Sequence, residues 1–265
     1  MKSLISVNNK FMDINPKELV EIILNYKYTK GIEICIEYGN VIEMKYLDDL
    51  VFEMKKNNLV LQIHGNSRLD LATNIEYMKK LEEYADYLGY PIVVTMHSIY
   101  DQDKEESLKK SIEYLGELVK NIDNDKIIIS VENLNDSKNL DRLEKEYITP
   151  MILNDEKLYF TYDIGHELAD YGNTTNLNEY LIEEIKNIHL HTHNSRKDHQ
   201  PIYENDIYWN DIMKSLVYLI NNNYAGNIVY EYDLYDCKGE TKVDKLNDYL
   251  KSIDLISEKY NWKEW

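Results

Sequence analysis

Short apolar runs of strand length alternate with amphipathic stretches along the whole chain. The apolar runs predict eight strands, at residues 3–9, 31–39, 58–66, 91–98, 126–135, 158–166, 185–194 and 227–233. Apolar residues at three- and four-residue spacing predict helices over 16–26, 45–57, 74–89, 105–122, 208–222 and 243–260. Strands that alternate with helices favour a parallel α/β fold, and eight of them predict a (β/α)8 barrel that forms one domain over residues 1–265.

Six of the expected strands have one uniformly apolar face and a second face that ends in a polar side chain. In the strand at 126–135, Ile127, Ile129 and Val131 share the apolar face. The opposite face ends in Glu132. Because alternate residues point to opposite sides of a strand, we expect the apolar face to contact the helices and the other face to line the barrel. The inward faces end, in chain order, in His64, His97, Glu132, Asp163, His189 with His191, and Glu231.

The histidines are also distributed unevenly between the expected strands and helices. All seven histidines lie in or just after an expected strand, and none lies in an expected helix: His64, His97, His166, His189, His191, His193 and His199. Active sites of such barrels lie at the carboxyl ends of the strands. We therefore expect His166 and His199 on the active rim and in contact with a substrate, and we interpret His193 as structural or facing solvent.

The inward side chains of the last four strands predict a metal site. Glu132, Asp163, His189 and Glu231 should converge there, and we expect them to bind one divalent ion, such as Mn²⁺, Zn²⁺, Co²⁺ or Mg²⁺. Three inward carboxylates without a cation would repel one another strongly, and Lys and Arg are scarce on these strand interiors. His64 and His97 could join Glu132 in a second metal site or hydrogen-bond a substrate.

The charge of the chain disfavours a nucleic-acid partner. The formal net charge is −18, which repels a phosphate backbone and an anionic membrane. Arg68, Arg142 and Arg196 are the only arginines. Arg68 and Arg196 fall in expected rim loops, where a guanidinium could hold one phosphate or carboxylate of a small substrate.

Cysteine usage and hydropathy point to the cytoplasm. Cys35 and Cys237 are too few for a disulfide framework and suggest a reduced compartment. The amino-terminal residues lack the apolar run of a signal peptide, and no apolar stretch of about 18 residues predicts a membrane helix. Whether the chain is a monomer or a homo-oligomer is left open by the sequence.

The strand endings ENLN, DIGH, IHLHTHN, RKDHQP and YEYD resemble those of the xylose-isomerase-like superfamily. This superfamily of TIM barrels contains sugar-phosphate isomerases and epimerases as well as apurinic endonucleases. The resemblance to the isomerase branch implies one divalent metal on Glu132, Asp163, His189 and Glu231, with His189 preferred to His191 because it precedes Leu190. It also implies that the two glutamates act as catalytic acid and base.

The resemblance to the endonuclease branch implies three zinc ions instead. The third would need His166, His199 and an aspartate two residues before His199, where this chain has Lys197. The sequence therefore favours a metal-dependent isomerase or epimerase of a small sugar or sugar phosphate, with the zinc-dependent phosphodiester hydrolase as the alternative. We expect the substrate to contact His64, His97, His166, His199 and Arg196. A barrel that only binds a ligand is a third hypothesis.

Overall fold

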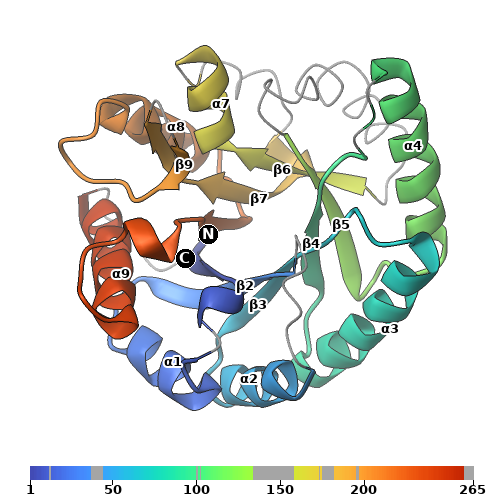
Figure 1. Ribbon diagram of the computed structural model, residues 1–265, viewed down its shortest axis with the longest axis horizontal. Coiled ribbons are helices and arrows are strands. Elements are labelled where there is room, and N and C mark those ends of the chain that lie inside the picture. The colour runs from blue at the N-terminus through green and yellow to red at the C-terminus, as the bar shows by residue number, and fades with distance from the viewer. Residues whose placement is uncertain are drawn as a thin grey trace.

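The fold is a closed barrel of eight parallel strands in a computed structural model (Figure 1). The structure describes residues 1–11, 13–36, 44–99, 101, 103–133, 158–172, 174, 182–194 and 197–259. The barrel strands are β1 (Lys2–Val7), β2 (Thr29–Cys35), β3 (Val60–His64), β4 (Ile92–Met96), β5 (Ile127–Glu132), β6 (Leu158–Asp163), β7 (Ile185–Leu190) and β10 (Asn227–Tyr230). They pair in chain order, and β1 pairs with β10 to close the barrel. The predicted (β/α)8 barrel is confirmed.

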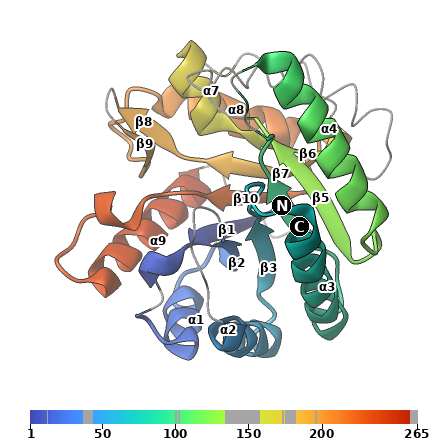
Figure 2. The same cartoon turned by 45° about the vertical axis from the view of Figure 1, so that its right-hand side comes forward.

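Helices surround the barrel on its outside (Figures 1 and 2). The described residues form α1 (Pro16–Leu24), α2 (Met44–Lys56), α3 (Leu71–Leu88), α4 (Lys104–Lys120), α7 (Ile164–Tyr171), α8 (Trp209–Asn221) and α9 (Lys242–Lys259). Local chemistry sets their ends: the Asp70 side chain accepts from the Thr73 amide at the start of α3, and Gly89 ends that helix with a φ of 86°. In the described part of the chain, no helix is both long and apolar enough to span a membrane.

The two faces of each strand have the predicted environments. Outward side chains such as Ile127, Ile129 and Val131 are buried in the main hydrophobic core. Inside the barrel, Leu4, Val60 and Val229 form a small apolar cluster. The interior also holds buried polar side chains from several strands: Glu33, Gln62, Thr95, Ser130, Thr161 and Asn187. The barrel interior is therefore partly polar.

The segment after β6 differs from the prediction. Residues 164–166 were expected to continue a strand, but α7 begins at Ile164, so His166 lies in its first turn. The expectation that no histidine is helical is therefore wrong for His166. The cause is local, because the Asp163 side chain accepts from the His166 amide at 2.8 Å and caps the helix.

The segment after β7 also adds structure that the pattern did not predict. A short antiparallel hairpin, β8 (Thr192–Asn194) and β9 (Lys197–Gln200), precedes α8. The hairpin carries His193 and His199. Strand β10 ends at Tyr230, so Glu231 follows the strand rather than lying within it. Arg142 and Arg196 lie outside the described residues.

Candidate functional site

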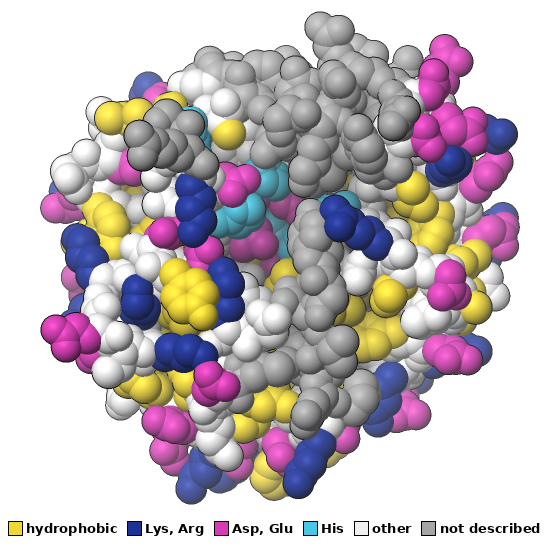
Figure 3. All heavy atoms as spheres, viewed as in Figure 1, with side chains coloured by type: hydrophobic (Ala, Val, Ile, Leu, Met, Phe, Trp, Pro, Cys, Tyr) yellow, Lys and Arg dark blue, Asp and Glu magenta, His cyan; other side chains and the backbone are white. Residues whose placement is uncertain are grey.

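Histidines and acidic side chains gather in a hollow near the centre of one face of the molecule (Figure 3). The hollow lies at the carboxyl-terminal mouth of the barrel, where β3, β5, β6 and β7 end in His64, Glu132, Asp163 and Leu190. The side chains of Glu132, Asp163 and His189 are fully buried. The inward faces predicted from strand alternation therefore do meet at one place.

His189 lies at the centre of this cluster. Its Nδ1 is 3.1 Å from Glu132 Oε1 and 3.0 Å from Glu231 Oε2. The same nitrogen is 3.9 Å from Asp163 Oδ2. On the other side of the ring, Nε2 lies 3.2 and 3.3 Å from the two oxygens of Glu33. One ring nitrogen thus faces the three predicted ligands, and the other faces a carboxylate that the sequence analysis missed.

The second oxygen of Glu132 contacts two further histidines. Glu132 Oε2 lies 3.1 Å from Nε2 of His64 and 2.9 Å from Nε2 of His97. The two imidazole rings meet edge to face, with centroids 4.8 Å apart. Glu132 therefore lies between two sets of histidines, with one oxygen toward His189 and the other toward the His64–His97 pair. His97 belongs to none of the described groups of donor atoms that lie within 4.8 Å of one another, so the expected second metal site is supported only by the two contacts of Glu132 Oε2.

Asp163 is held by several groups at once. Its two carboxylate oxygens lie 3.2 Å from Nε2 of His191, and one also caps α7. Its backbone is tied to Asn133, whose Oδ1 accepts from the Asp163 amide at 2.6 Å and whose Nδ2 donates to the Asp163 carbonyl at 3.1 Å. Asn133 therefore links the ends of β5 and β6 and fixes the position of Asp163.

His166 and His199 lie on the rim of the same cluster. Nδ1 of His166 is 2.8 Å from the Asn133 carbonyl oxygen. Nδ1 of His199 is 3.0 Å from Asp198, and its Nε2 is 3.5 Å from Glu231 Oε2. The Nε2 atoms of both histidines have no protein hydrogen bond among the described residues except this contact with Glu231. Both side chains are therefore suitably placed for a substrate.

Burial and charge displace the pKa values of the central groups in opposite directions. Burial disfavours the imidazolium of His189, but Glu33, Glu132 and Glu231 outweigh it and hold the pKa of His189 well above its usual value. Burial likewise disfavours ionised Glu132 and Glu231, yet nearby histidines, above all His189, hold both pKa values well below the ordinary range. The site therefore keeps Glu132 and Glu231 ionised, as a cation-binding site requires.

Near the mouth, the pKa of His64 is raised to about 10. Burial alone would lower this pKa, but Cys35 and Glu132 raise it by more. The pKa of His199 is also raised, because Glu231 and Asp198 outweigh its burial. Burial lowers the pKa of His166 despite the opposing charge of Asp163. His166 is thus the neutral member of the rim histidines at neutral pH.

The donor atoms fit a divalent metal ion. Ligands that lie about 2.1 Å from one ion are roughly 3.0–3.4 Å from their neighbours, which is the spacing of His189 Nδ1 from the two glutamates. Glu231 Oε2 is buried and has no hydrogen bond of good geometry within the part of the chain that the structure describes. No Lys or Arg forms a salt bridge with Glu132, Asp163 or Glu231 within the described ranges.

The donor atoms form three overlapping groups, each with members within 4.8 Å of one another. The groups are His64, Glu132, His189 and Glu231; Glu132, Asp163 and His166; and His166, His191 and His199. Three of the four predicted ligands share the first group, and Asp163 joins them through Glu132. The third group has a different composition from the predicted third zinc site, because His191 lies there.

Lys197 does not enter the site. Its Nζ forms ion pairs with Asp233 and Asp236. His193 stacks on Tyr208 with ring centroids 4.6 Å apart. Arg68 is exposed on the loop after β3. Arg196, a predicted substrate contact, lies outside the described residues.

Glu33 is the principal residue that sequence reasoning missed. It lies on β2 and is fully buried. The alternation in this strand, with Ile32 and Ile34 on the outward face, would have placed it inside the barrel. It was overlooked because it lies in the middle of its strand and not at the end.

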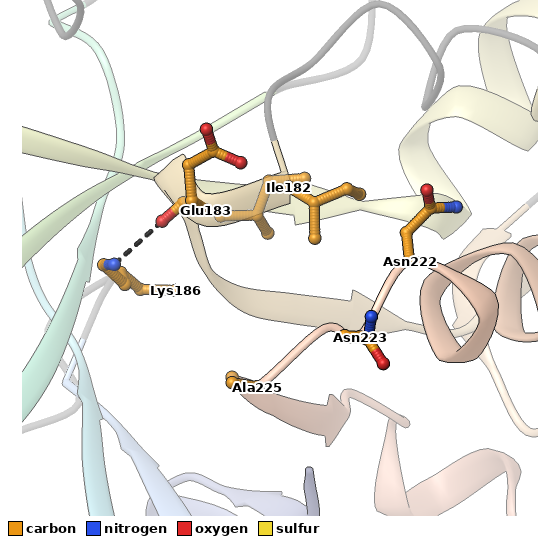
Figure 4. Close-up of a pocket in the computed structure, with 8 residues that line it drawn as sticks. Ile182, Glu183, Lys186, Asn222, Asn223 and Ala225 are labelled. Atoms are coloured by element: carbon orange, nitrogen blue, oxygen red, sulfur yellow. Dashed lines mark hydrogen bonds between the residues drawn. The ribbon is translucent and has the colours of Figure 1, made fainter.

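A separate pocket of about 440 Å³ lies at the opposite end of the barrel. Ile185 begins β7 and Gly226 precedes β10, so the pocket borders the amino-terminal ends of these strands. In Figure 4 the Lys186 side chain donates to the Glu183 carbonyl oxygen, at 2.8 Å. No histidine lines this pocket, which separates it from the chemistry of the hollow.

Comparison of the sequence with protein families gives one match over most of its length. Residues 29–254 match the family described as "Xylose isomerase-like TIM barrel". A protein of Methanocaldococcus jannaschii, the uncharacterised MJ1188, is 27% identical over 161 residues. That alignment covers 57% of this chain and 55% of MJ1188, so the chain spans about half the length of this relative.

Solved structures with the same fold cover nearly the whole chain. The apo 3-keto-D-glucoside 4-epimerase YcjR of E. coli is 13% identical with a TM-score of 0.70, covering 97% of this chain and 99% of that one. The IolI protein with a bound zinc atom is 17% identical with a TM-score of 0.71, with coverages of 98% and 99%. A family 2 AP endonuclease of Brucella melitensis is 15% identical with a TM-score of 0.61, with coverages of 91% and 95%. Identities this low establish the fold alone.

Proposed function

Because the chain belongs to the xylose isomerase-like TIM-barrel family, we propose that it is a divalent-metal-dependent isomerase or epimerase of a small sugar or sugar phosphate. The observation that carries the proposal is the position of His189 Nδ1, within 3.9 Å of oxygens from Glu132, Asp163 and Glu231. The zinc atom in the structurally similar IolI protein and the epimerase activity named for YcjR support it.

We assign the metal ligands to Glu132, Asp163, His189 and Glu231. A bound divalent ion would polarise a substrate carbonyl or hydroxyl and make the adjacent C–H more acidic. Zinc and manganese both accept a mixed nitrogen and oxygen ligand set. His64, His97 and Glu132 form a candidate second site, which the bridging position of Glu132 supports.

Glu132 and Glu231 are the proposed acid and base. In the resting site both are ionised, because the neighbouring histidines hold their pKa values well below the usual range, so either can act as the base, and the glutamate that takes up the substrate proton can then act as the acid. One glutamate can therefore remove a proton from a substrate carbon while a second group returns a proton to it. His166 and His199 on the rim, with Arg196, are proposed to hold substrate oxygens, and His64 and His97 do so if no second ion is bound.

Solvent isotope exchange tests this function. The purified protein is loaded with Mn²⁺ or Zn²⁺ and incubated in deuterated water with ketohexoses, such as D-fructose and D-tagatose, and their phosphates. We expect deuterium at the carbon next to the carbonyl of an accepted sugar. Glu132→Gln and Glu231→Gln should each abolish exchange, and the metal content of both variants must be measured because both residues are proposed ligands.

The alternative function predicts a different result. A zinc-dependent phosphodiester hydrolase of the AP endonuclease type would cleave DNA at an abasic site and would exchange no sugar proton. The fold of the Brucella melitensis enzyme favours this alternative, while the net charge of −18 and the ion pairs of Lys197 with Asp233 and Asp236 oppose it. Efficient abasic-site cleavage near physiological salt would overturn our proposal. Purified protein that binds no metal would instead favour a barrel that only binds a ligand.

A further inference from the structure

Glu33 is a buried carboxylate that the proposed chemistry does not use. Its side chain is fully buried in the barrel interior. Its hydrogen-bond partners among the described residues are His189 Nε2 at 3.3 Å and Asn187 Nδ2 at 3.0 Å. No Lys or Arg pairs with it within those ranges. A buried carboxylate is costly unless it is paired, so this position requires a physical reason.

The orientation of the His189 ring supplies that reason. Nδ1 faces Glu132 and Glu231, and Nε2 faces Glu33 from the opposite side. A proton on Nε2 is present both in the imidazolium and in the neutral tautomer that leaves Nδ1 free to coordinate. Glu33 therefore keeps its hydrogen bond from His189 whether Nδ1 carries a proton or a metal ion.

We propose that Glu33 is a positioning residue that holds the proton of His189 on Nε2 and presents Nδ1 to a divalent ion. The inference rests on the proposed metal site and deepens it. Outer carboxylates that accept from a coordinating histidine fix the tautomer and the ring orientation, and their loss typically weakens metal binding about 10- to 100-fold.

The carboxylate of Glu33 is itself held in place. Asn187 lies two residues before His189 on β7 and shares its inward face. Its Nδ2 donates to Glu33 Oε2 and lies 3.3 Å from the Thr95 hydroxyl on β4. A chain of hydrogen bonds across the barrel therefore fixes Glu33 relative to the strand that carries His189.

The neighbouring strand offers a matched control. Gln62 lies opposite Glu33 in the register of β2 and β3, and it is similarly buried. Neither amide atom of Gln62 has a hydrogen bond to another described residue. Gln62→Ala therefore removes a side chain of nearly equal size from the same layer without removing a partner of His189.

The first test measures Zn²⁺ affinity by competition with a chelator. Glu33→Ala should weaken binding about 10- to 100-fold. Gln62→Ala should bind zinc as the unsubstituted protein does, and Glu33→Gln, which keeps the size and one acceptor oxygen, should fall between Glu33→Ala and the unsubstituted protein. Equal weakening by Glu33→Ala and Gln62→Ala would overturn the inference, because it would reduce Glu33 to a packing role.

The second test needs no substitution, so it holds even if Glu33→Ala fails to fold. Nitrogen-15 NMR of histidine in the zinc-loaded protein should find His189 coordinated through Nδ1 and protonated on Nε2. A proton on Nδ1 would overturn the inference. If the unsubstituted protein binds no zinc, the proposed metal site itself is wrong. If it binds zinc and Glu33→Ala binds equally well, only the role of Glu33 is wrong.

Discussion

Both carboxylate oxygens of Asp163 lie 3.2 Å from Nε2 of His191. Nδ1 of His191 contacts the backbone of Thr192 and His199, at 3.1 and 3.2 Å. With its proton on Nε2, His191 donates to Asp163 while its Nδ1 accepts from the His199 amide, so both nitrogens have protein partners. His189 instead directs Nδ1 toward Glu132 and Glu231. This contrast supports His189 as the metal ligand and gives His191 the role of orienting Asp163.

His189→Ala and His191→Ala should separate these two roles. Removing a direct ligand should lower zinc affinity much more than removing a residue that orients a ligand, for which a loss of about 10- to 100-fold is expected. Calorimetric titration of each metal-free variant with zinc measures the difference. A larger loss in His191→Ala would reverse the assignment.

Asp163 combines a proposed metal contact with a helix cap, and two substitutions can separate them. Asparagine is also a good cap, so Asp163→Asn should lose bound metal while its melting temperature stays near that of the unsubstituted protein. Asp163→Ala should lose bound metal and also at least about 1 kcal/mol of stability, because it removes the helix cap and leaves buried His191 Nε2 without its partner. Elemental analysis gives the metal content and circular dichroism the melting temperature. Unchanged metal in both variants would reject Asp163 as a ligand.

Gly165 lies against the ring of His191. A β-carbon at this position would overlap the atoms of the His191 ring, so Gly165→Ala must displace the ring that orients Asp163. We expect lower metal affinity and lower stability. Gly116, inside α4, has nothing within 4 Å of its β-carbon position, and Gly116→Ala should instead raise stability by about 1 kcal/mol. Thermal unfolding and zinc titration of both variants test this prediction, which a Gly165→Ala protein with normal metal affinity would contradict.

Metal binding should release a proton. Because the carboxylates outweigh burial and hold the pKa of His189 well above its usual value, His189 is protonated at neutral pH in the metal-free protein. A metal ion must displace the proton on Nδ1, so zinc affinity should rise with pH, about tenfold per pH unit for one proton. Titration in buffers of different ionisation enthalpy counts the protons released. A pH-independent affinity between pH 6 and 8 would contradict the prediction.

The raised pKa of His64 makes a further prediction for the metal-free protein. A pKa raised in the folded state contributes stability that is present below the unfolded value of about 6.5 and is lost as pH rises through the folded value. The pKa of His64 in the folded protein is about 10, because Cys35 and Glu132 raise this pKa by more than burial lowers it. The melting temperature of the metal-free protein should therefore fall between pH 7 and 10. His64→Gln should reduce that slope, and an unchanged slope would contradict the prediction.

The sequence by itself determined the barrel and the direction of most site residues. Alternation along a strand is a local property, so the apolar faces containing Ile127, Ile129 and Val131 also fixed Glu132 as inward-facing. Parallel strands in a closed barrel bring their carboxyl ends together, and the predicted inward groups meet as a result.

Tertiary structure decided how those groups pair. Glu33 approaches His189 across the barrel from a strand 156 residues away in the chain, and no local pattern encodes that contact. The hydrogen-bond partners of His191 are Asp163 and the His199 amide, which the β8–β9 hairpin places beside its ring. Spacing in the sequence alone could therefore not separate the role of His191 from that of His189. Hydrogen-bond direction and ring orientation depend on neighbours distant in sequence, and only the closed barrel brings these neighbours together.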